Sequence, residues 1–207
     1  MPDWSAHFYN GFMWPLEQAG LQRLRRRLLQ TAQGRVLELG VGTGVNWPLY
    51  GLAGSVELLF GLDVGGAKLT GVGARQTAVS PATILQADAQ TLPFAPDAFD
   101  TVVATLVFCS IPRPEVALAE VARVLRPNGR FLLLEHVRGQ GSISRRLTDW
   151  LQPVWYALQR ECHLNRETAL SVAQAGFHIE QISTHGWGVV QMIRSRNAAI
   201  PQSPCPK

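Results

Sequence analysis

Three glycines spaced two residues apart, Gly40, Gly42 and Gly44, follow directly on a short apolar stretch, and Glu38 stands two residues before the first of them. Glycine has no Cβ, so such a segment can turn tightly and bring its backbone within contact distance of a ligand. The pattern is typical of a nucleotide pocket, although glycine-rich turns also occur without one. A carboxylate here would repel a pyrophosphate but attract a ligand that carries an ammonium group and a positively charged sulfur. We therefore expect S-adenosylmethionine to be the cofactor.

Acidic side chains follow the next two apolar stretches, at the points where each would end as a strand. Asp63 ends the stretch 55–62 and lies 19 residues after Gly44, close to the spacing at which a carboxylate meets the ribose hydroxyls of an adenosine. Asp88 follows the stretch 83–87, where a carboxylate either accepts from the adenine amino group or caps a turn. Acids at successive strand ends favour a nucleoside-binding site.

Candidate strands alternate with helical stretches from residue 35 to about residue 185, which predicts an α/β protein with helices on both faces of a mostly parallel sheet. Several candidate strands are continuous apolar runs, as expected for strands buried on both sides. The last two are joined by a short Thr-His-Gly link, which predicts an antiparallel hairpin at the sheet edge. The seven expected strands are 36–39, 55–62, 83–87, 102–108, 131–134, 177–183 and 187–194.

Helical patterns fill the gaps between these strands. One helix, 115–126, ends at a Pro-Asn-Gly sequence, and another, 166–175, is preceded by Asn165 as a cap and stopped by Gly176. A third segment, 144–161, is helical in pattern but contains a proline and three aromatic residues. It should lie over the carboxyl edge of the sheet, where open α/β sheets bind ligands. A substrate lid and ordinary core aromatics are both open interpretations of it.

The composition is that of one globular domain. With 207 residues the chain can bury a sizeable core, and 46% hydrophobic against 16% charged residues makes it too apolar to be disordered. Apolar runs of 18 or more residues are lacking, and the N-terminus does not have the basic-then-apolar order of a signal peptide. We therefore expect a cytoplasmic protein.

Three cysteines, Cys109, Cys162 and Cys205, are widely spaced and form no Cys-x-x-Cys pair. This pattern argues against a disulfide framework and against a structural zinc site. We predict reduced thiols and no metal. Cys109 is expected in a pocket wall, and Cys162 with His163 is expected to pack at a helix end unless closure of a lid brings them into the site.

Positive charge is concentrated near the N-terminus, in a chain whose net charge is only +4. Leucines recur at helical spacing among these basic residues and aromatic residues precede them, a pattern typical of a basic helix on an anionic membrane surface. A solvated arginine face on a helix packed over the pocket is the other open interpretation of residues 1–30. Outside this patch no basic stripe with interleaved aromatics occurs, so nucleic acid is not an expected partner. The crowded arginines are Arg23, Arg25, Arg26 and Arg27.

Taken together, these motifs resemble the class I S-adenosylmethionine-dependent methyltransferases of the type-11 group over residues 35–185. The motifs that carry the resemblance are 36–44, Asp63, 86–90, 92–94, 98–100 and 124–129. The resemblance implies a Rossmann-like fold with a seven-stranded, mostly parallel sheet, helices on both faces and an antiparallel last strand. The cofactor residues that it implies are Glu38, Gly40, Gly42 and Gly44 at the methionine part, Asp63 at the ribose, Asp88 and Ala89 at the adenine, and Thr105 near the amino-acid end or the sulfur.

The sequence patterns also predict how the chain is divided. The methyltransferase domain is expected over 33–197, with a substrate lid inserted at 137–165. A helical arm or lid is expected over 1–32, and a disordered tail over 198–207.

A narrower resemblance concerns the acceptor. The segments 105–110, 135–137 and 162–168 are similar to the methyltransferase-like alkyl-thiol S-methyltransferases, and the glycine loop is also similar to bacterial phospholipid N-methyltransferases. The implied reaction is methyl transfer to a small or lipophilic acceptor, with a thiol sulfur favoured and the amine of phosphatidylethanolamine as the alternative. A non-catalytic cofactor-binding or membrane-surface module is a third interpretation. A nicotinamide oxidoreductase is disfavoured, because it would carry a third glycine three residues after the second and no acid at position 38.

Methyl transfer from a sulfonium is an in-line displacement, so the protein must mainly align the reactants and exclude water. A thiol acceptor with an ordinary pKa of about 8.5 is mostly protonated at pH 7, and a nearby base would therefore help. His136, at the end of the fifth strand, is the predicted catalytic base. Its neighbour Glu135 must face the opposite way on a strand, so if Glu135 points into the pocket, His136 is structural.

Overall fold

The computed structural model describes residues 20–51, 55–65, 77, 79–159 and 162–198. Most of the predicted arm and tail, residues 1–19 and 199–207, therefore lies outside the described residues. Within the described ranges no helix is both long and apolar enough to cross a membrane. The strands are β1 (Gly34–Leu39), β2 (Val56–Asp63), β3 (Ala82–Gln86), β4 (Phe99–Thr105), β5 (Leu125–His136), β6 (Phe177–His185) and β7 (Val190–Asn197).

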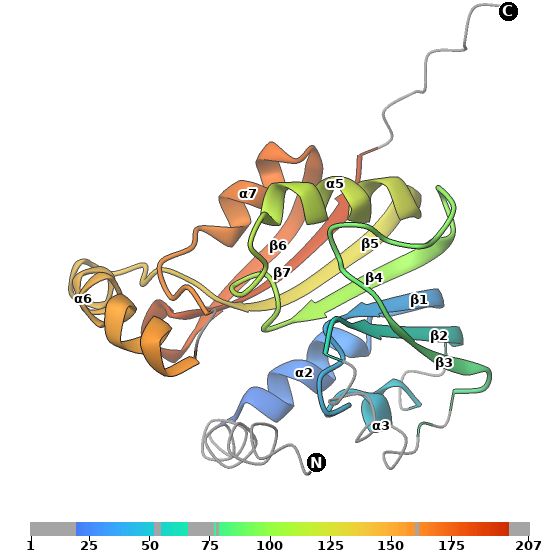
Figure 1. Cartoon of the computed structure of the whole chain (residues 1–207), viewed down its shortest axis with the longest axis horizontal. Coiled ribbons are helices and arrows are strands. Elements are labelled where there is room, and N and C mark those ends of the chain that lie inside the picture. The colour runs from blue at the N-terminus through green and yellow to red at the C-terminus, as the bar shows by residue number, and fades with distance from the viewer. Residues whose placement is uncertain (1–19, 52–54, 66–76, 78, 160–161, 199–207) are drawn as a thin grey trace, which may run out of the picture.

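All seven strands form one sheet in the order β3-β2-β1-β4-β5-β7-β6 (Figure 1). The neighbours from β3 to β5 pair in parallel. Strand β7 runs antiparallel to both β5 and β6. This confirms the predicted mostly parallel sheet with an antiparallel last strand. The order reverses between β1 and β4, which is the kind of place where open α/β sheets bind ligands at their carboxyl edge.

Helices cover both faces of the sheet (Figure 1). They are α2 (Gln22–Leu29), α3 (Trp47–Tyr50), α5 (Pro114–Val124), α6 (Ser142–Gln159) and α7 (Thr168–Gln174). Helices α5 and α7 pack on one face, and α2 and α3 on the other. Helix α6 lies beyond the carboxyl end of β4, on the side of the molecule where the loops that follow the strands gather.

Side chains that alternate between the two faces of the central strands form two hydrophobic cores, one on each face of the sheet. In β4, Val102 and Ala104 belong to the apolar cluster under α5, whereas Val103 between them belongs to the cluster under α2. Successive strand residues point to opposite faces, so an unbroken apolar run fills both cores at once. The sheet is thereby fixed between two helical layers, and its carboxyl edge presents a defined set of loops.

Several predicted boundaries were wrong. Helix α5 ends at Val124 rather than at residue 126, and β5 runs from Leu125 rather than from residue 131, so the Pro-Asn-Gly sequence lies within β5. Three other differences have a visible structural reason. Strand β4 ends at Thr105 rather than at residue 108, because Leu106 adopts a left-handed φ of +59° and turns the chain. Strand β7 begins at Val190, since residues 186–188 form a 3-10 turn in which Trp187 has a φ of +60°. Helix α7 begins at Thr168 without a side-chain cap, so Asn165 is not its cap.

Candidate cofactor site

The loop after β1 has the left-handed backbone that its glycines allow. Gly40, Gly42 and Gly44 have φ angles of +63°, +55° and +76°. A Cβ at Gly40 would lie 2.4 Å from Cγ2 of Val107, so the loop and the chain after β4 are in close contact there. Among the described residues beyond its chain neighbours, the nearest atom to a Cβ at Gly42 would be the carbonyl oxygen of Gly40, at 4.0 Å. The backbone at Gly42 therefore faces open space, which fits the close approach of a ligand.

Asp63, the last residue of β2, lies directly beside this loop. Its Oδ2 accepts a hydrogen bond of 2.9 Å from the N–H of Gly42, and its Oδ1 accepts one of 2.8 Å from the N–H of Gly65. Each carboxylate oxygen can accept a second hydrogen bond. The side chain thus keeps acceptor capacity for two hydroxyl groups next to the open backbone of Gly42, which fits the predicted ribose contact.

Asp88 is exposed and makes the contacts of a turn cap. Its Oδ1 accepts a hydrogen bond of 2.8 Å from the N–H of Gln90, and its Oδ2 accepts one of 2.9 Å from the Gln90 side-chain amide. Ala89 beside it is buried. The turn-capping interpretation therefore accounts for the hydrogen bonds of Asp88, and contact of Asp88 and Ala89 with an adenine stays a prediction.

Glu38 belongs to a buried polar cluster below the glycine loop. The side-chain amide of Asn46 donates 2.7 Å to Oε1 of Glu38 and 2.9 Å to Oγ1 of Thr105, the last residue of β4. Burial raises the pKa of Glu38 to about 7, while hydrogen bonding from Asn46 and Tyr50 and the charge of Arg25 act to lower it. Two residues predicted from separate motifs, Glu38 and Thr105, are thus joined through Asn46, which the sequence reasoning did not identify.

Arg25 supplies the cation of this cluster. Its Nη1 donates 2.5 Å to Oγ1 of Thr105 and 3.1 Å to Oδ1 of Asn46, and the residue is only 5% exposed. Neither interpretation of the basic helix anticipated an arginine turned inward. The sequence did contain an indication of this burial. Leu21, Arg25 and Leu28 follow the i, i+4, i+7 spacing of one helix face, and the two leucines are buried too. The neighbours that remain exposed are Arg23, Arg26 and Arg27.

Glu38 is not an isolated negative charge at the base of the glycine loop. The carboxyl has a pKa of about 7 and shares its cluster with a guanidinium. Its negative charge is offset inside the protein, so it cannot alone select a cationic ligand. The open backbone at Gly42 and the acceptor capacity of Asp63 carry the cofactor assignment instead.

Glu135, near the end of β5, holds the chain that follows β4. It is fully buried, and its carboxylate accepts hydrogen bonds from the N–H groups of Val107 (3.0 Å), Phe108 (3.0 Å) and Cys109 (3.3 Å). Burial raises the pKa of Glu135 to about 7 against the opposing effect of these three bonds. Glu135 therefore builds the loop after β4, which also explains why β4 ends early.

His136 is the last residue of β5 and lies where β5 approaches α6. Its ring packs edge-on to Trp155 of α6, with 6.3 Å between the ring centroids. Cys109 and Cys162 are its other close neighbours, so Cys162 lies beside His136 rather than only at a helix end. The role of His136 as a catalytic base stays a prediction.

Comparison with known proteins agrees with this geometry. Residues 37–133 match the methyltransferase domain family. The chain is 34% identical over 149 residues to the thiol S-methyltransferase TMT1B of Rattus norvegicus, covering 71% of this chain and 61% of the relative. It is 36% identical over 115 residues to the phosphatidylethanolamine N-methyltransferase of Cereibacter sphaeroides, covering 54% of this chain and 55% of the relative. The chain thus spans less than two thirds of either relative.

A solved structure shares the fold. The S-adenosylmethionine-dependent methyltransferase of Mesorhizobium loti superposes with a TM-score of 0.66 at 20% identity, covering 86% of this chain and 97% of that one. At this identity the likeness shows the fold alone. With the matched domain, the sequence relatives and the sheet order, the chain belongs to the class I S-adenosylmethionine-dependent methyltransferases of the type-11 group.

Proposed function

We propose that the protein transfers the methyl group of S-adenosylmethionine to a small or lipophilic acceptor, and that the favoured acceptor atom is a thiol sulfur. The observation that carries the proposal is the open left-handed backbone at Gly42 with Asp63 hydrogen-bonded beside it. Both lie at the carboxyl edge of the sheet, next to the reversal of strand order between β1 and β4. When bound there, the cofactor supplies a methyl group on a positively charged sulfur.

Each predicted residue has a part in this proposal. Asp63 holds the ribose hydroxyls through its remaining lone pairs, and Gly42 lets the cofactor approach the main chain. Glu38 and Thr105 belong to the cluster that supports the methionine end. Asp88 and Ala89 bound the adenine. The protein's contribution is to hold the acceptor atom in line with the methyl group, which can account for about 7–11 kcal/mol of a barrier.

The preference for a thiol is supported by the name of the rat relative, a thiol S-methyltransferase that is 34% identical over 149 residues. The acceptor side of the proposed site is the region beyond β4 and β5, where α6 lies. In this proposal His136, at the end of β5 and beside α6, accepts the proton of the thiol.

A phospholipid amine is the second candidate acceptor, and one feature of α6 favours it. Ile143, Leu147 and Trp150 are 80%, 49% and 74% exposed and follow the i, i+4, i+7 spacing of one helix face. Arg146, also exposed, borders that face, whereas Arg145 lies on the opposite side of the helix. Exposed apolar residues with an adjacent arginine are a feature of helices that lie in a membrane interface. The Cereibacter sphaeroides relative is named for phosphatidylethanolamine.

An acceptor panel with methyl-labelled S-adenosylmethionine tests the proposal. We expect label in the thioether formed from a lipophilic alkyl thiol, and none when the same compound is supplied already S-methylated. Label in phosphatidylethanolamine vesicles without label in thiols would establish the second candidate instead. A protein that binds the cofactor but labels no thiol, phospholipid or phenol would contradict the proposed function and favour a non-catalytic module.

A further inference from the structure

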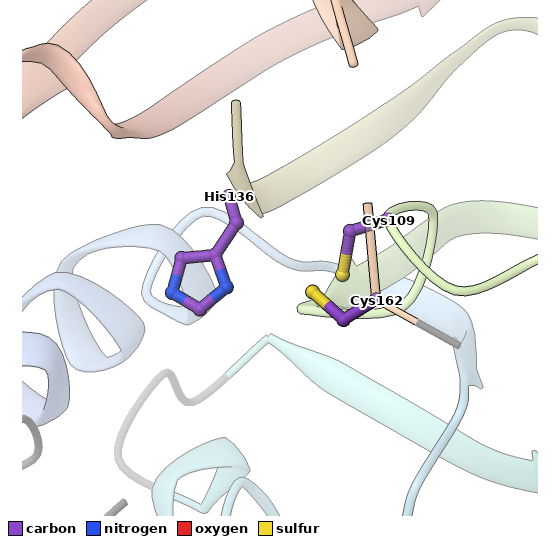
Figure 2. Close-up of side chains that lie close together, drawn as sticks. All are labelled: Cys109, His136 and Cys162. Atoms are coloured by element: carbon purple, nitrogen blue, oxygen red, sulfur yellow. The ribbon is translucent and has the colours of Figure 1, made fainter. Parts of the chain in front are cut away.

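Three side chains that commonly bind metals meet at the carboxyl edge of the sheet although they come from separate parts of the chain. Cys109 lies in the turn after β4, His136 ends β5, and Cys162 lies between α6 and α7. Their sulfur and ring nitrogen atoms all lie within 4.8 Å of one another. Figure 2 shows the two sulfurs facing each other and the imidazole of His136 turned toward them.

The separations are close to those of a zinc site. With Zn–S bonds of about 2.3 Å and Zn–N bonds of about 2.0 Å, the ligand atoms of a tetrahedral site lie about 3.5–3.8 Å apart. The ligand atoms need to move closer together by at most about 1.0–1.3 Å to meet this geometry. Two thiolates and an imidazole are also the ligand types that favour Zn²⁺ over hard cations such as Mg²⁺.

The two cysteine-bearing segments are already fixed to each other. The N–H of His163 donates 2.8 Å to the carbonyl oxygen of Cys109, and the N–H of Cys109 donates 3.3 Å to the carboxylate of Glu135. The guanidinium of Arg166 donates to the carbonyl oxygen of Phe108. These bonds hold the ligand residues in place through their main chains, as a site with a prepared geometry requires.

The three side chains are largely shielded from solvent. Cys109 is 2% exposed and Cys162 is 9% exposed, and His136 beside them is half-buried. Inside the protein a bound cation would balance the charge of two thiolates, and an unpaired buried charge is costly. Arg166 is close enough to both thiols to act on their charge. A hydrogen bond with Cys162, burial and the nearby Glu135 raise the pKa of the Cys109 thiol, so a bound metal would have to displace this proton.

We propose that Cys109, His136 and Cys162 bind one Zn²⁺ with three protein ligands and leave the fourth tetrahedral position open. On binding, each thiol releases its proton to solvent and forms one Zn–S bond, and no electron is transferred. Three protein ligands with an open position are typical of catalytic rather than structural zinc. The sequence predicted no metal, because spacing rules detect ligands close in the chain, and these come from three separate elements.

The open fourth position of the zinc could bind the thiol that accepts the methyl group. This part of the inference rests on the proposed thiol methylation. A thiol that binds Zn²⁺ loses its proton outright, so the acceptor would attack as a thiolate. Its new S–C bond forms as the bond between the methyl carbon and the cofactor sulfur breaks, and the proton has already gone to solvent. In this arrangement the imidazole of His136 is a zinc ligand and does not act as the base. The metal, instead of His136, ionises the acceptor thiol.

Metal binding is tested on the full-length protein without S-adenosylmethionine, under a metal-free reductant. We expect one Zn²⁺ per chain in a competition titration against a chromophoric chelator. Cys109→Ser, Cys162→Ser and His136→Gln should each lower zinc affinity by more than about 100-fold, above the 10- to 100-fold effect of residues that only support ligands. Cys205→Ser is the matched cysteine control and should retain full zinc binding.

Folding and cofactor binding are followed in the same samples. Thermal melting and calorimetric titration with S-adenosylmethionine show whether each variant is folded, so a loss of zinc with the cofactor still bound is specific to the metal site. Zinc binding below one per chain in the wild type, or equal in Cys162→Ser and Cys205→Ser, would overturn the proposal and leave the methyltransferase function intact.

Replacement of zinc by Co²⁺ tests the open position. We expect thiolate-to-cobalt charge-transfer absorption that is lost in Cys109→Ser and Cys162→Ser. Addition of an alkyl thiol should strengthen this absorption, because a third thiolate joins the metal. An unchanged spectrum at saturating thiol would contradict the open fourth position.

Discussion

Gly40→Ala is expected to lower the free energy of unfolding by about 2–5 kcal/mol. Two costs act together at this position. The left-handed φ of +63° costs a residue with a Cβ about 1–2 kcal/mol. The new Cβ would also lie 2.4 Å from Cγ2 of Val107, and such overpacking costs about 1–3 kcal/mol. Urea unfolding followed by circular dichroism measures the change.

Gly42→Ala is the matched control, because Gly42 has a similar φ of +55° but open space where the Cβ would lie. It should cost only about 1–2 kcal/mol of stability, while weakening the binding of S-adenosylmethionine. Val107→Ala should reduce the cost of Gly40→Ala in a double-mutant cycle. Equal stability losses for the two glycine variants would show that the contact with Val107 does not constrain the loop.

Arg25→Met is expected to destabilise the protein by about 3–5 kcal/mol at pH 9, as when one partner of a buried ion pair is removed. Methionine keeps much of the apolar stem but leaves Glu38, Asn46 and Thr105 without their cation. Urea unfolding across pH tests this. The exposed Arg23 on the same helix provides the control Arg23→Met, which should change stability by less than about 0.5 kcal/mol.

The loss of stability caused by Arg25→Met should depend on pH. Arg25 acts to lower the pKa of Glu38, which burial has raised from 4.5 to about 7, so removal of Arg25 raises this pKa further. A carboxyl with a raised folded-state pKa binds more protons when native than when unfolded, and stability falls as pH rises through that range. The penalty should therefore be smaller at pH 6 than at pH 9, and Glu38→Gln should remove most of the difference. A penalty independent of pH would contradict the coupling.

The features that could be predicted from the sequence are those that depend on residues close together in the chain. Apolar runs, turn residues and strand-end acids located all seven strands, the glycine loop and Asp63. The end of β4 and the start of β7 were missed because they depend on left-handed residues, Leu106 and Trp187. The end of β4 also depends on the carboxylate of Glu135, 28 positions away, which accepts from the N–H of Val107. The strand propensity of these residues does not show that a distant carboxylate accepts hydrogen bonds from their N–H groups, which are then not available for pairing in the sheet.

Side-chain contacts between residues far apart in the chain were the second feature that could not be predicted from the sequence. Arg25 bonds to Asn46 and Thr105, which lie 21 and 80 positions along the chain. In the sequence this arginine was one of a basic run, and its burial could be inferred only from the leucines that share its helix face. The group formed by Cys109, His136 and Cys162 was missed for the same reason, since only the arrangement of β4, β5 and α6 brings its members together.

The most direct test of the cofactor assignment is a calorimetric titration of S-adenosylmethionine into the wild-type protein, Asp63→Asn and Glu57→Gln, with NAD as the competing ligand. Glu57→Gln is the control, an exposed acid on the same strand as Asp63. We predict one site for S-adenosylmethionine, weakened at least about tenfold by Asp63→Asn through a loss of about 1.4 kcal/mol or more. Glu57→Gln should bind as the wild type does, and NAD should not compete. Binding of NAD in preference to S-adenosylmethionine, or equal binding by Asp63→Asn and Glu57→Gln, would contradict the account.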